Sequence, residues 1–559
     1  MIMTTKLIFP KLNSSGSILA VIFALLLASV IFFTNLGKYP LFNPDEALYA
    51  EPALEMLKSH DYITTSLNYV IRFTKPPLDI WAMVLSYKIF GINEFAARFP
   101  GAAAGYLTLI FTTIFTYKYL NKKTALWLCL IFSQAPLFIT IAREAITDMP
   151  LTLFITIAVI NFYTSLKEAK TPYLSYIMIG LAIMTKGPVG LVLPGLSLSI
   201  FYLLKGELII AFKKINIVKA CLIILGIALP WYITEIYITN GAYFKEFIIR
   251  ENFQRFTGVV DAHKGQSWYH LVVFCLGFLP WSIFFPVILA KIFKDFKLKN
   301  NNLTGIKAIQ NLITTIPIKT NNLIQQNPDL EIILLCLIQV VVTIAFFSIS
   351  VSKLIPYTLP AYPFAAILLS YYLPKLTNKE FIGSCTFLNI IFGASYFILP
   401  KYFYKLRDTT PQINDFILNY LLFGFIATLI CLGLSFSRQK KLSIIMFCLF
   451  SVLSITYFGI KGYGLISNIW ELPIKNFAIA LSNNQVPILI YDLRKPSIMF
   501  YAKRKILIPL NYQQFTNCLK LNHQAYIISK TKNISTLSQF TKIKLIKTDG
   551  LFSLFYYQN

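Results

Sequence analysis

Carboxylates and cations gather in a few short polar segments of an otherwise apolar chain. The segment FNPDEALYAEPALEM contains Asp45, and TKPPLDIW, which follows it, contains Lys75. Farther along, REAITDMP contains Asp148 and TKGP contains Lys186. A carboxylate can take a proton from a hydroxyl as a general base, and cationic side chains can stabilise the charge on a departing phosphate. These residue types predict group transfer from a phosphate-bearing donor, provided that the fold brings the segments together.

The composition determines which elements must position these residues. The chain has 559 residues, 56% of them hydrophobic and 13% charged, with a mean hydropathy of +0.63. Soluble domains carry about a quarter charged residues, so the sequence predicts a polytopic membrane protein. The formal charge of +27 comes from 51 Lys and Arg against 24 Asp and Glu. These cations sit in short loops between apolar runs, which indicates membrane orientation and argues against nucleic acid.

About thirteen apolar runs reach or approach the roughly 20 residues that a spanning helix needs. The loops between them form two alternating sets, one of them short and rich in lysine. Because positively charged loops stay inside, we expect this basic set and the N-terminal tail to be cytoplasmic. The basic set comprises residues 118–123, 165–170, 205–219, 291–299, 374–379 and 437–441.

The second set of loops is therefore expected on the outer face, and it carries the ionisable residues named above together with Lys353. Ionisable groups at membrane depth are costly and are usually functional. Several separate loops deliver both signs of charge to one side, which is typical of an active site at a membrane interface. This outer set comprises residues 36–96, 142–150, 185–188, 239–268, 350–357 and 400–410.

Two domains are predicted, a transmembrane domain over 1–460 and a small outer domain over 461–559. The second region contains short β-like runs such as VPILIYD, AYIISK and GLFSLFYY, with turn-rich segments between them. This pattern predicts an α/β or α+β domain, placed outside by an odd number of spans. The long inner loop at 297–329 carries no interpretable motif.

The acidic pair in the first outer loop has two interpretations. Asn43 is a suitable helix N-cap, and Asp45 and Glu46 would favour the positive end of a helix dipole, so both acids could simply begin a surface helix. Alternatively, Asp45 and Tyr49 share a helix face and Pro52 interrupts the helix one turn later, an arrangement that would aim a carboxylate. The residues alone leave both interpretations open.

Five motifs in order resemble one known superfamily. FNPDEALYAEPALEML, TKPPLDIWAMVLSYKIFGINEFAARFPGA, REAITDMPL, TKGPVGLVLPG and SKLIPYTLPAYP look like those of the GT-C glycosyltransferases related to aminoarabinose transferase and protein O-mannosyltransferases. The resemblance covers roughly the first 375 residues. The later pattern LIYDLRKPSIMFYAKRKILI resembles the small outer domain of the aminoarabinose transferase branch. The resemblance implies an all-α GT-C membrane domain with amphipathic helices on its outer face.

The resemblance also implies roles for individual residues. Asp45 would be the catalytic carboxylate with Tyr49 beside it, Asp148 would be the second acidic residue, and Lys75 would contact the lipid phosphate. Structural alternatives stand beside two of these expectations: Asp148 could cap the next span, and Lys186 could be a lysine that snorkels from a span end. Further phosphate or sugar contacts would come from Lys186, Arg255, Lys353 and Tyr357.

The motifs depart from the family pattern at two positions. Leu48 stands where the family usually has arginine, and Thr74 stands where the aminoarabinose branch often has an acidic residue before KPP. In that branch this acidic residue and a later histidine are implicated in metal binding. His263 lies near the histidine position, so a divalent metal stays an open alternative with His263 as its candidate ligand, and no other cofactor is implied.

The leading interpretation is an inverting transferase that moves a sugar from a polyprenyl-phosphate donor to an acceptor on the outer face. The acceptor would be a lipid A-like glycolipid, another envelope glycan or a protein hydroxyl. The absence of a glycine-rich nucleotide loop favours a lipid-linked donor. A transporter or flippase of polyprenyl-linked glycans and an inactive scaffold are the alternatives. The composition suggests a bacterial inner-membrane protein whose site faces the periplasm.

Overall fold

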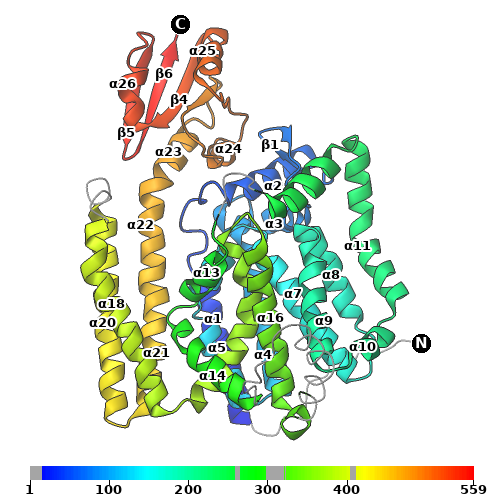
Figure 1. Cartoon of the computed structure of the whole chain (residues 1–559). Helices are drawn as coiled ribbons and strands as arrows, with labels where there is room; N and C mark the ends of the chain where they lie inside the picture. The colour runs from blue at the N-terminus through cyan, green and yellow to red at the C-terminus, as the bar shows by residue number, and fades with distance from the viewer. Residues whose placement is uncertain (1–14, 259–264, 297–319, 321–322, 403–410) are drawn as a thin grey trace.

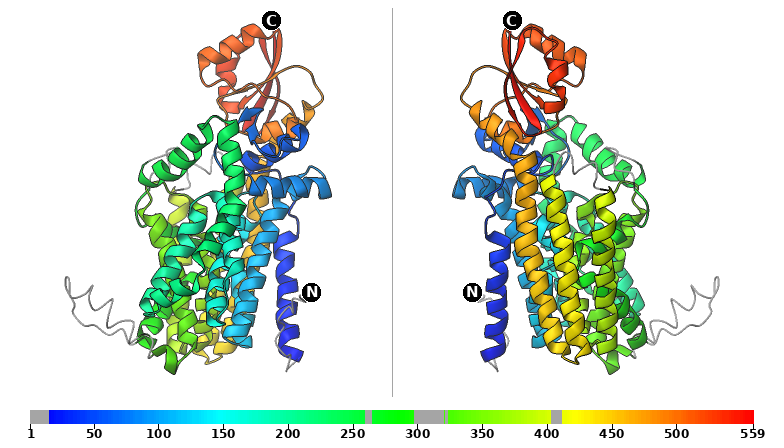
Figure 2. Two further views of the ribbon diagram at one scale, coloured as in Figure 1. Left: turned by 90° about the vertical axis from the view of Figure 1, so that its right-hand side faces the viewer. Right: turned by 90° about the vertical axis from the view of Figure 1, so that its left-hand side faces the viewer.

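The computed structural model describes residues 15–258, 265–296, 320, 323–402 and 411–559. Its main body is a bundle of long helices, and a small domain containing a β-sheet lies at one end of that bundle (Figures 1 and 2). The prediction of a polytopic helical fold with a C-terminal domain containing strands is confirmed.

The bundle is built from helices that run between its two ends. They are α1 (Ser15–Phe33), α4 (Glu94–Tyr119), α5 (Lys122–Phe132), α6 (Pro136–Ala142), α7 (Asp148–Lys167), α8 (Tyr173–Lys186), α9 (Val189–Leu204), α10 (Leu208–Lys214), α11 (Ile217–Ile238), α13 (Tyr269–Gly277), η2 (Trp281–Phe284), α14 (Phe285–Asp295), α16 (Asp329–Ile349), η3 (Ile355–Ala361), α17 (Tyr362–Tyr372), η4 (Leu373–Lys375), α18 (Asn378–Tyr402), α20 (Pro411–Phe436), α21 (Lys440–Leu453), η5 (Ser454–Gly459) and α22 (Ile460–Trp470).

The helices are long and apolar enough to make this an integral membrane protein. Within the described ranges, seven helices meet the length and hydropathy of a membrane span, or up to nine if each of two bent helix pairs is one span. The bent pairs are α5 with α6, at 69°, and α13 with η2 and α14, at 112°. Three shorter apolar helices, Ile18–Phe33, Tyr173–Lys186 and Val189–Leu204, account for further apolar runs among the roughly thirteen that the sequence predicts.

Helix α7 occupies the centre of the bundle. In its most apolar window 78% of the residues are buried inside the protein, against 17% for α11, which lies at the edge. A helix that is apolar all round is expected in such a central position. Because α7 begins at Asp148, its central position fixes where the second candidate carboxylate lies.

Ion pairs join the lysine-rich loops at the bundle end away from the small domain (Figure 1). Lys118, at the end of α4, contacts Glu168, just after α7, with 2.9 Å between Nζ and Oε1. Lys291 of α14 contacts Glu380 of α18 with 3.0 Å between Nζ and Oε2. The loops of the predicted basic set therefore meet one another, as alternation along the chain requires.

The opposite end of the bundle carries the first long loop and the small domain. Its elements are α2 (Ala47–Ser59), the hairpin β1 (Ser66–Leu67) and β2 (Val70–Ile71), α3 (Leu78–Phe90), the π-helix η1 (Phe244–Gln254) and α12 (Arg255–Thr257). Figure 2 shows α2 and its neighbours lying between the bundle and the small domain.

The small domain contains a four-stranded mixed sheet in the order β3-β4-β6-β5. Strands β3 and β4 are parallel, with Ile488 opposite Tyr526, and the other two pairings are antiparallel. Its elements are α23 (Leu472–Ala480), β3 (Ile488–Tyr491), α24 (Ser497–Ala502), α25 (Tyr512–Leu521), β4 (Gln524–Lys530), η6 (Thr531–Asn533), α26 (Ile534–Leu537), β5 (Ile543–Asp549) and β6 (Phe552–Gln558). Helix α22 leads into this domain and continues to Trp470, past the predicted last span at residue 460.

Candidate active site

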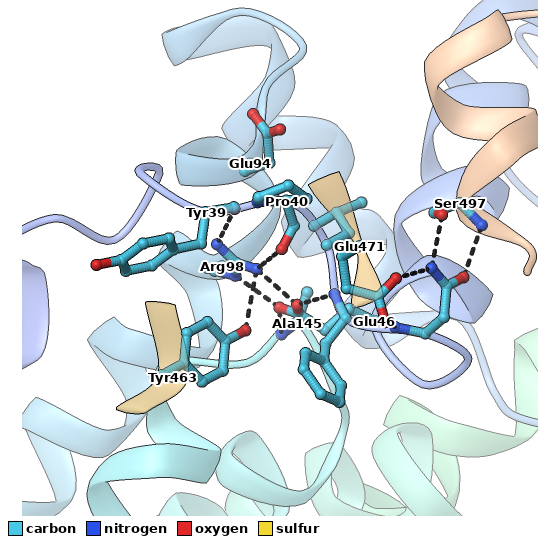
Figure 3. Close-up of polar contacts among 12 residues, drawn as sticks. Tyr39, Pro40, Glu46, Glu94, Arg98, Ala145, Tyr463, Glu471 and Ser497 are labelled. Carbon is cyan, nitrogen blue, oxygen red and sulfur yellow. Dashed lines mark hydrogen bonds and ion pairs between the residues drawn. The ribbon is translucent and has the colours of Figure 1, made fainter. Parts of the chain in front are cut away.

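The turn before α2 separates the two acidic residues of the first outer loop. Glu46 is fully buried, whereas its neighbour Asp45 is exposed. The Glu46 carboxylate accepts two hydrogen bonds from Arg98, each 2.7 Å long, and one of 2.9 Å from the backbone N–H of Ala145 (Figure 3). Glu46 therefore anchors the turn to α4 and to the loop before α7, and Asp45 remains exposed to solvent next to this anchor.

Of the two interpretations left open for this segment, the one with Asn43 as the helix N-cap is not borne out. Helix α2 begins at Ala47, after the turn, and Pro52 lies inside it without ending it. Instead of capping, the Asn43 side chain donates to Glu471 at 2.5 Å and to Ser497 at 2.6 Å (Figure 3). These partners belong to the small domain. A tertiary contact, rather than a local helix preference, therefore determines the position of the Asn43 side chain.

A buried ion pair lies at the start of α7. The Lys186 ammonium donates to the Asp148 carboxylate, and each side chain is 11% exposed. The same ammonium lies 4.8 Å from the ring centroid of Tyr357, a cation–π geometry. Gly187 makes this possible: its φ of +79° ends α8 sharply, and a Cβ there would lie 2.9 Å from Phe247.

Lys75 of the KPP motif lies beside this pair. Its ammonium is 3.8 Å from the Glu251 carboxylate, which also accepts from Arg255 at 3.1 Å. Burial lowers the pKa of Lys75 to about 8, with a further contribution from the nearby Lys186 ammonium. A cation whose charge is disfavoured in this way is ready to accept an anionic partner.

Tyr49 connects the first outer loop to this cluster. The Arg72 guanidinium lies 5.5 Å from its ring centroid and also donates to the backbone carbonyl of Leu48. Burial raises the pKa of Tyr49, and its hydroxyl interacts electrostatically with Lys186 and Asp148. Tyr49 therefore lies near the pair of Lys186 and Asp148, and its place beside Asp45 and among the donor contacts stays a prediction.

Part of this cluster lines a cavity of about 400 Å³, although Asp148 and Tyr49 are not in its wall. Three cations line it, Lys75, Lys186 and Arg255, against the single carboxylate of Glu251, and Tyr357 lies among them. The rest of its wall is largely apolar and comes from α9, η1 and α16. The apolar residues are Pro188, Val189, Val192, Ile248, Phe253, Phe346 and Phe347. A cavity that combines cations with an apolar wall suits a lipid that carries a phosphate.

Asp45 does not line this cavity, and Glu144 is the residue that connects the two carboxylates. The pKa of Glu144 is raised to about 8, chiefly by burial and also by the charges of Glu46, Asp45 and Asp148. Glu144 therefore lies within electrostatic range of both candidate catalytic residues. Glu144 lies inside the motif REAITDMP, but no local sequence signal distinguishes it, because its environment comes from residues distant in the sequence such as Asp45 and Glu46.

A second cavity, of about 270 Å³, lies on the other side of this loop. Arg98 and Arg143 line it together with apolar residues of α6, α20 and α22. Arg143, at the start of the loop from Arg143 to Asp148, lines this second cavity. Asp148, at the end of the loop, pairs with Lys186, which lines the 400 Å³ cavity. An arrangement of this kind can hold two amphiphilic molecules on either side of a carboxylate cluster.

Lys353 does not line the 400 Å³ cavity. The Lys353 ammonium donates to the backbone carbonyls of Phe347, Ser348 and Ser350 at 2.5 to 3.1 Å, so its donors close the end of α16. His263 lies outside the described residues. His270 is buried and its Nε2 lies 3.2 Å from the Leu354 carbonyl oxygen. Among the residues that the structure describes, no group of three His, Cys, Asp or Glu side chains could hold a metal.

Several known proteins are similar to this chain in sequence or fold. A family model described as dolichyl-phosphate-mannose-protein mannosyltransferase matches residues 74–233. An uncharacterized protein of Aquifex aeolicus is 33% identical over 261 residues, which cover 46% of this chain and 51% of that protein. An undecaprenyl phosphate-alpha-4-amino-4-deoxy-L-arabinose arabinosyl transferase of Yersinia enterocolitica is 28% identical over 393 residues, 68% of this chain and 64% of that relative.

One solved structure shares the fold over nearly the whole chain. ArnT from Cupriavidus metallidurans, crystallised with undecaprenyl phosphate, matches with a TM-score of 0.74 and 20% identity, over 97% of this chain and 98% of that one. The matches to the curated relatives described above span about half to two thirds of those proteins. The chain therefore shares the fold of this ArnT structure, and its residues 74–233 match the mannosyltransferase family model.

Proposed function

We propose that the protein transfers a sugar from a polyprenyl-phosphate donor to an acceptor on the outer face of a bacterial inner membrane. The observation that carries this proposal is the 400 Å³ cavity, whose three cations face an apolar wall at the membrane-embedded bundle. A donor of this class has the matching halves: an anionic phosphate for Lys75, Lys186 and Arg255, and a polyprenyl chain for the apolar side. The names of the Yersinia relative and of the Cupriavidus structure, both of which include undecaprenyl phosphate, support the same donor class.

The chemistry follows from the charges. The acceptor hydroxyl oxygen attacks the anomeric carbon from the face opposite the phosphate, so the configuration inverts. Asp45 takes the hydroxyl proton, and the bond from the anomeric carbon to the phosphate oxygen breaks. The polyprenyl phosphate leaves as an anion, whose charge Lys75 and Arg255 stabilise. Asp148 keeps Lys186 in position through their ion pair.

Asp45 is the preferred base because its surroundings differ from those of Asp148 and Glu46. Asp148 is paired with Lys186, and Glu46 is committed to Arg98, whereas Asp45 is exposed at the end of the turn. An exposed carboxylate can reach an acceptor that arrives from outside. The second cavity, with its apolar wall and two arginines, supports an amphiphilic acceptor such as an envelope glycolipid.

Donor binding tests this proposal. With the protein in nanodiscs, binding of undecaprenyl phosphate is measured for wild type, Lys75→Met and Lys219→Met, the last an exposed lysine at the start of α11. Hydrogen bonds to charged groups contribute roughly 1.5–3 kcal/mol, so Lys75→Met should weaken binding by about tenfold or more. Lys219→Met should bind as wild type does. Equal binding by all three proteins would contradict the proposed donor cavity.

A further inference from the structure

The small domain contains a large cleft where its parallel strands end. The cleft has a volume of about 1000 Å³. It is lined at the end of β3 by Tyr491 and Asp492 and at the end of β4 by Lys530, Thr531 and Lys532. In open sheets with parallel strands, ligands bind outside the carboxyl ends of those strands. Its position in the fold therefore marks this cleft as a binding site.

The cleft is strongly basic. Arg494, Lys495, Lys530 and Lys532 line it against the single carboxylate of Asp492. Lys530 and Lys532 lie 3.5 and 3.7 Å from that carboxylate, so one acid faces two ammonium groups. Arg494 is exposed, and among the described residues no carboxylate pairs with it. The net charge of the lining groups favours an anionic ligand.

Aromatic rings stand beside these cations. Trp470, at the end of α22, and Tyr512, at the start of α25, both line the cleft with 37% and 56% of their surface exposed. Rings that combine an apolar face with a polar edge suit ligands that are themselves amphipathic, as sugar rings are. The volume is far larger than a single phosphate ion needs, which argues for a saccharide that carries the anionic groups.

A chain of contacts connects the cleft to the turn that bears Asp45. The Lys495 ammonium contacts Glu471 at 2.7 Å, and Glu471 accepts from the Asn43 side chain at 2.5 Å. Asn43 lies two residues before Asp45 in that turn. An anion bound at Lys495 would therefore act on the same carboxylate that holds the turn in place.

We propose that this cleft binds the anionic saccharide part of the acceptor, a sugar chain bearing phosphate or carboxylate groups. The inference rests on the proposed function and deepens it, because it places recognition of the acceptor in the small domain, apart from the donor cavity. Its cations select the acceptor's charge, its rings select a sugar, and the Glu471 contact couples occupancy to the catalytic turn.

The test uses the full chain in nanodiscs of zwitterionic lipid and a soluble bisphosphorylated glucosamine disaccharide as the probe. We expect the probe to bind wild type, and we expect the dephosphorylated disaccharide and inorganic phosphate each to bind at least tenfold more weakly. Arg494→Glu should weaken binding of the probe at least tenfold. Lys544→Glu, an exposed lysine on β5 that does not line the cleft, should leave it unchanged.

Three outcomes would overturn the inference: unchanged binding by Arg494→Glu, inorganic phosphate that binds as tightly as the disaccharide, or complete displacement of the probe by phosphatidylglycerol vesicles, which would indicate membrane docking. Undecaprenyl phosphate binding separates this inference from the proposed function. If Arg494→Glu and wild type both bind that lipid and the disaccharide equally well, only the inference fails. If wild type binds the disaccharide and not the lipid, the proposed function fails.

Discussion

Lys75 has an environment that makes its charge depend on pH in the working range. Its pKa falls from 10.5 to about 8 because burial disfavours the ammonium form and Lys186 repels it. In the folded protein without ligand, Lys75 is mostly charged below pH 8 and loses its proton above it. A bound phosphate favours the charged form, so ligand binding and protonation are linked.

The affinity for undecaprenyl phosphate should therefore fall as pH rises above 8, by at most about tenfold for each pH unit. Lys75→Arg keeps its charge throughout this range, because arginine does not lose its proton, and should show a flatter profile. Binding measured in nanodiscs between pH 7 and 9.5 checks both expectations. A wild-type profile as flat as that of Lys75→Arg would show that Lys75 does not contact the phosphate.

Several site residues can be found from sequence motifs, and others cannot. Lys75, Lys186, Arg255 and Tyr357 lie in recognisable segments, and the structure brings all four to one cavity. The sequence does not indicate that Asp45 is exposed and Glu46 is buried, because the partner of Glu46, Arg98, lies 52 residues away along the chain. Lys353 also lies in a motif segment, but its ammonium donates hydrogen bonds to nearby backbone carbonyls.

At the scale of elements, one buried ion pair holds the first outer loop on the bundle. Arg98 of α4 is 2% exposed and makes further hydrogen bonds to the backbone carbonyls of Leu36, Tyr39 and Pro40. It therefore fixes both the approach to the turn and the turn itself (Figure 3). Removal of one partner from a buried pair leaves an uncompensated charge.

Arg98→Met should therefore destabilise the protein by about 3–5 kcal/mol, whereas Arg98→Met combined with Glu46→Gln should recover part of that loss. The control is Lys118→Met, which breaks a pair whose side chains are about one third exposed and should change stability by less than about 1 kcal/mol. Thermal unfolding in detergent measures all three variants. Equal melting temperatures for Arg98→Met and Lys118→Met would contradict the anchoring role.

The boundaries of helices can be predicted from the sequence where one surrounding, such as the bilayer, sets their length. Apolar runs predict the spans because a bilayer imposes their length. The start of α2 at Ala47 could not be predicted from the sequence. The Asn43 side chain donates a hydrogen bond to Glu471 instead of capping a helix. Pro52 lies in the second turn of α2 and cannot donate to the Leu48 carbonyl, which accepts from the Arg72 side chain instead.

At the scale of the whole molecule, the small domain and the first outer loop form one structure. Besides the Asn43 contacts, the backbone N–H of Leu41 donates to the Tyr501 hydroxyl at 2.8 Å, and Lys475 pairs with Glu94 at 2.5 Å. These contacts join residues that are hundreds of positions apart. Sequence patterns predicted both regions separately, but they could not predict that one supports the other.

Asn43 is therefore expected to act as a positioning residue for Asp45. Asn43→Ala should lower kcat for sugar transfer by about tenfold, because small displacements of catalytic groups are costly, while KM for the donor stays near the wild-type value. Asn522→Ala, which removes a hydrogen bond to Cys518 within the small domain, is the matched control and should leave both constants unchanged. A raised KM with normal kcat would indicate a donor-binding role instead.

The central claim is that Asp45 is the base in sugar transfer from a polyprenyl-phosphate donor. The most direct measurement follows radiolabel leaving polyprenyl-phosphate sugars in the presence of extracted envelope lipids, for wild type, Asp45→Asn and Asp415→Asn, an exposed aspartate on α20. We expect wild type and Asp415→Asn to consume donor at equal rates, and Asp45→Asn to lose at least about a hundredfold in rate while binding undecaprenyl phosphate normally. Transfer by Asp45→Asn at the wild-type rate would contradict the claim.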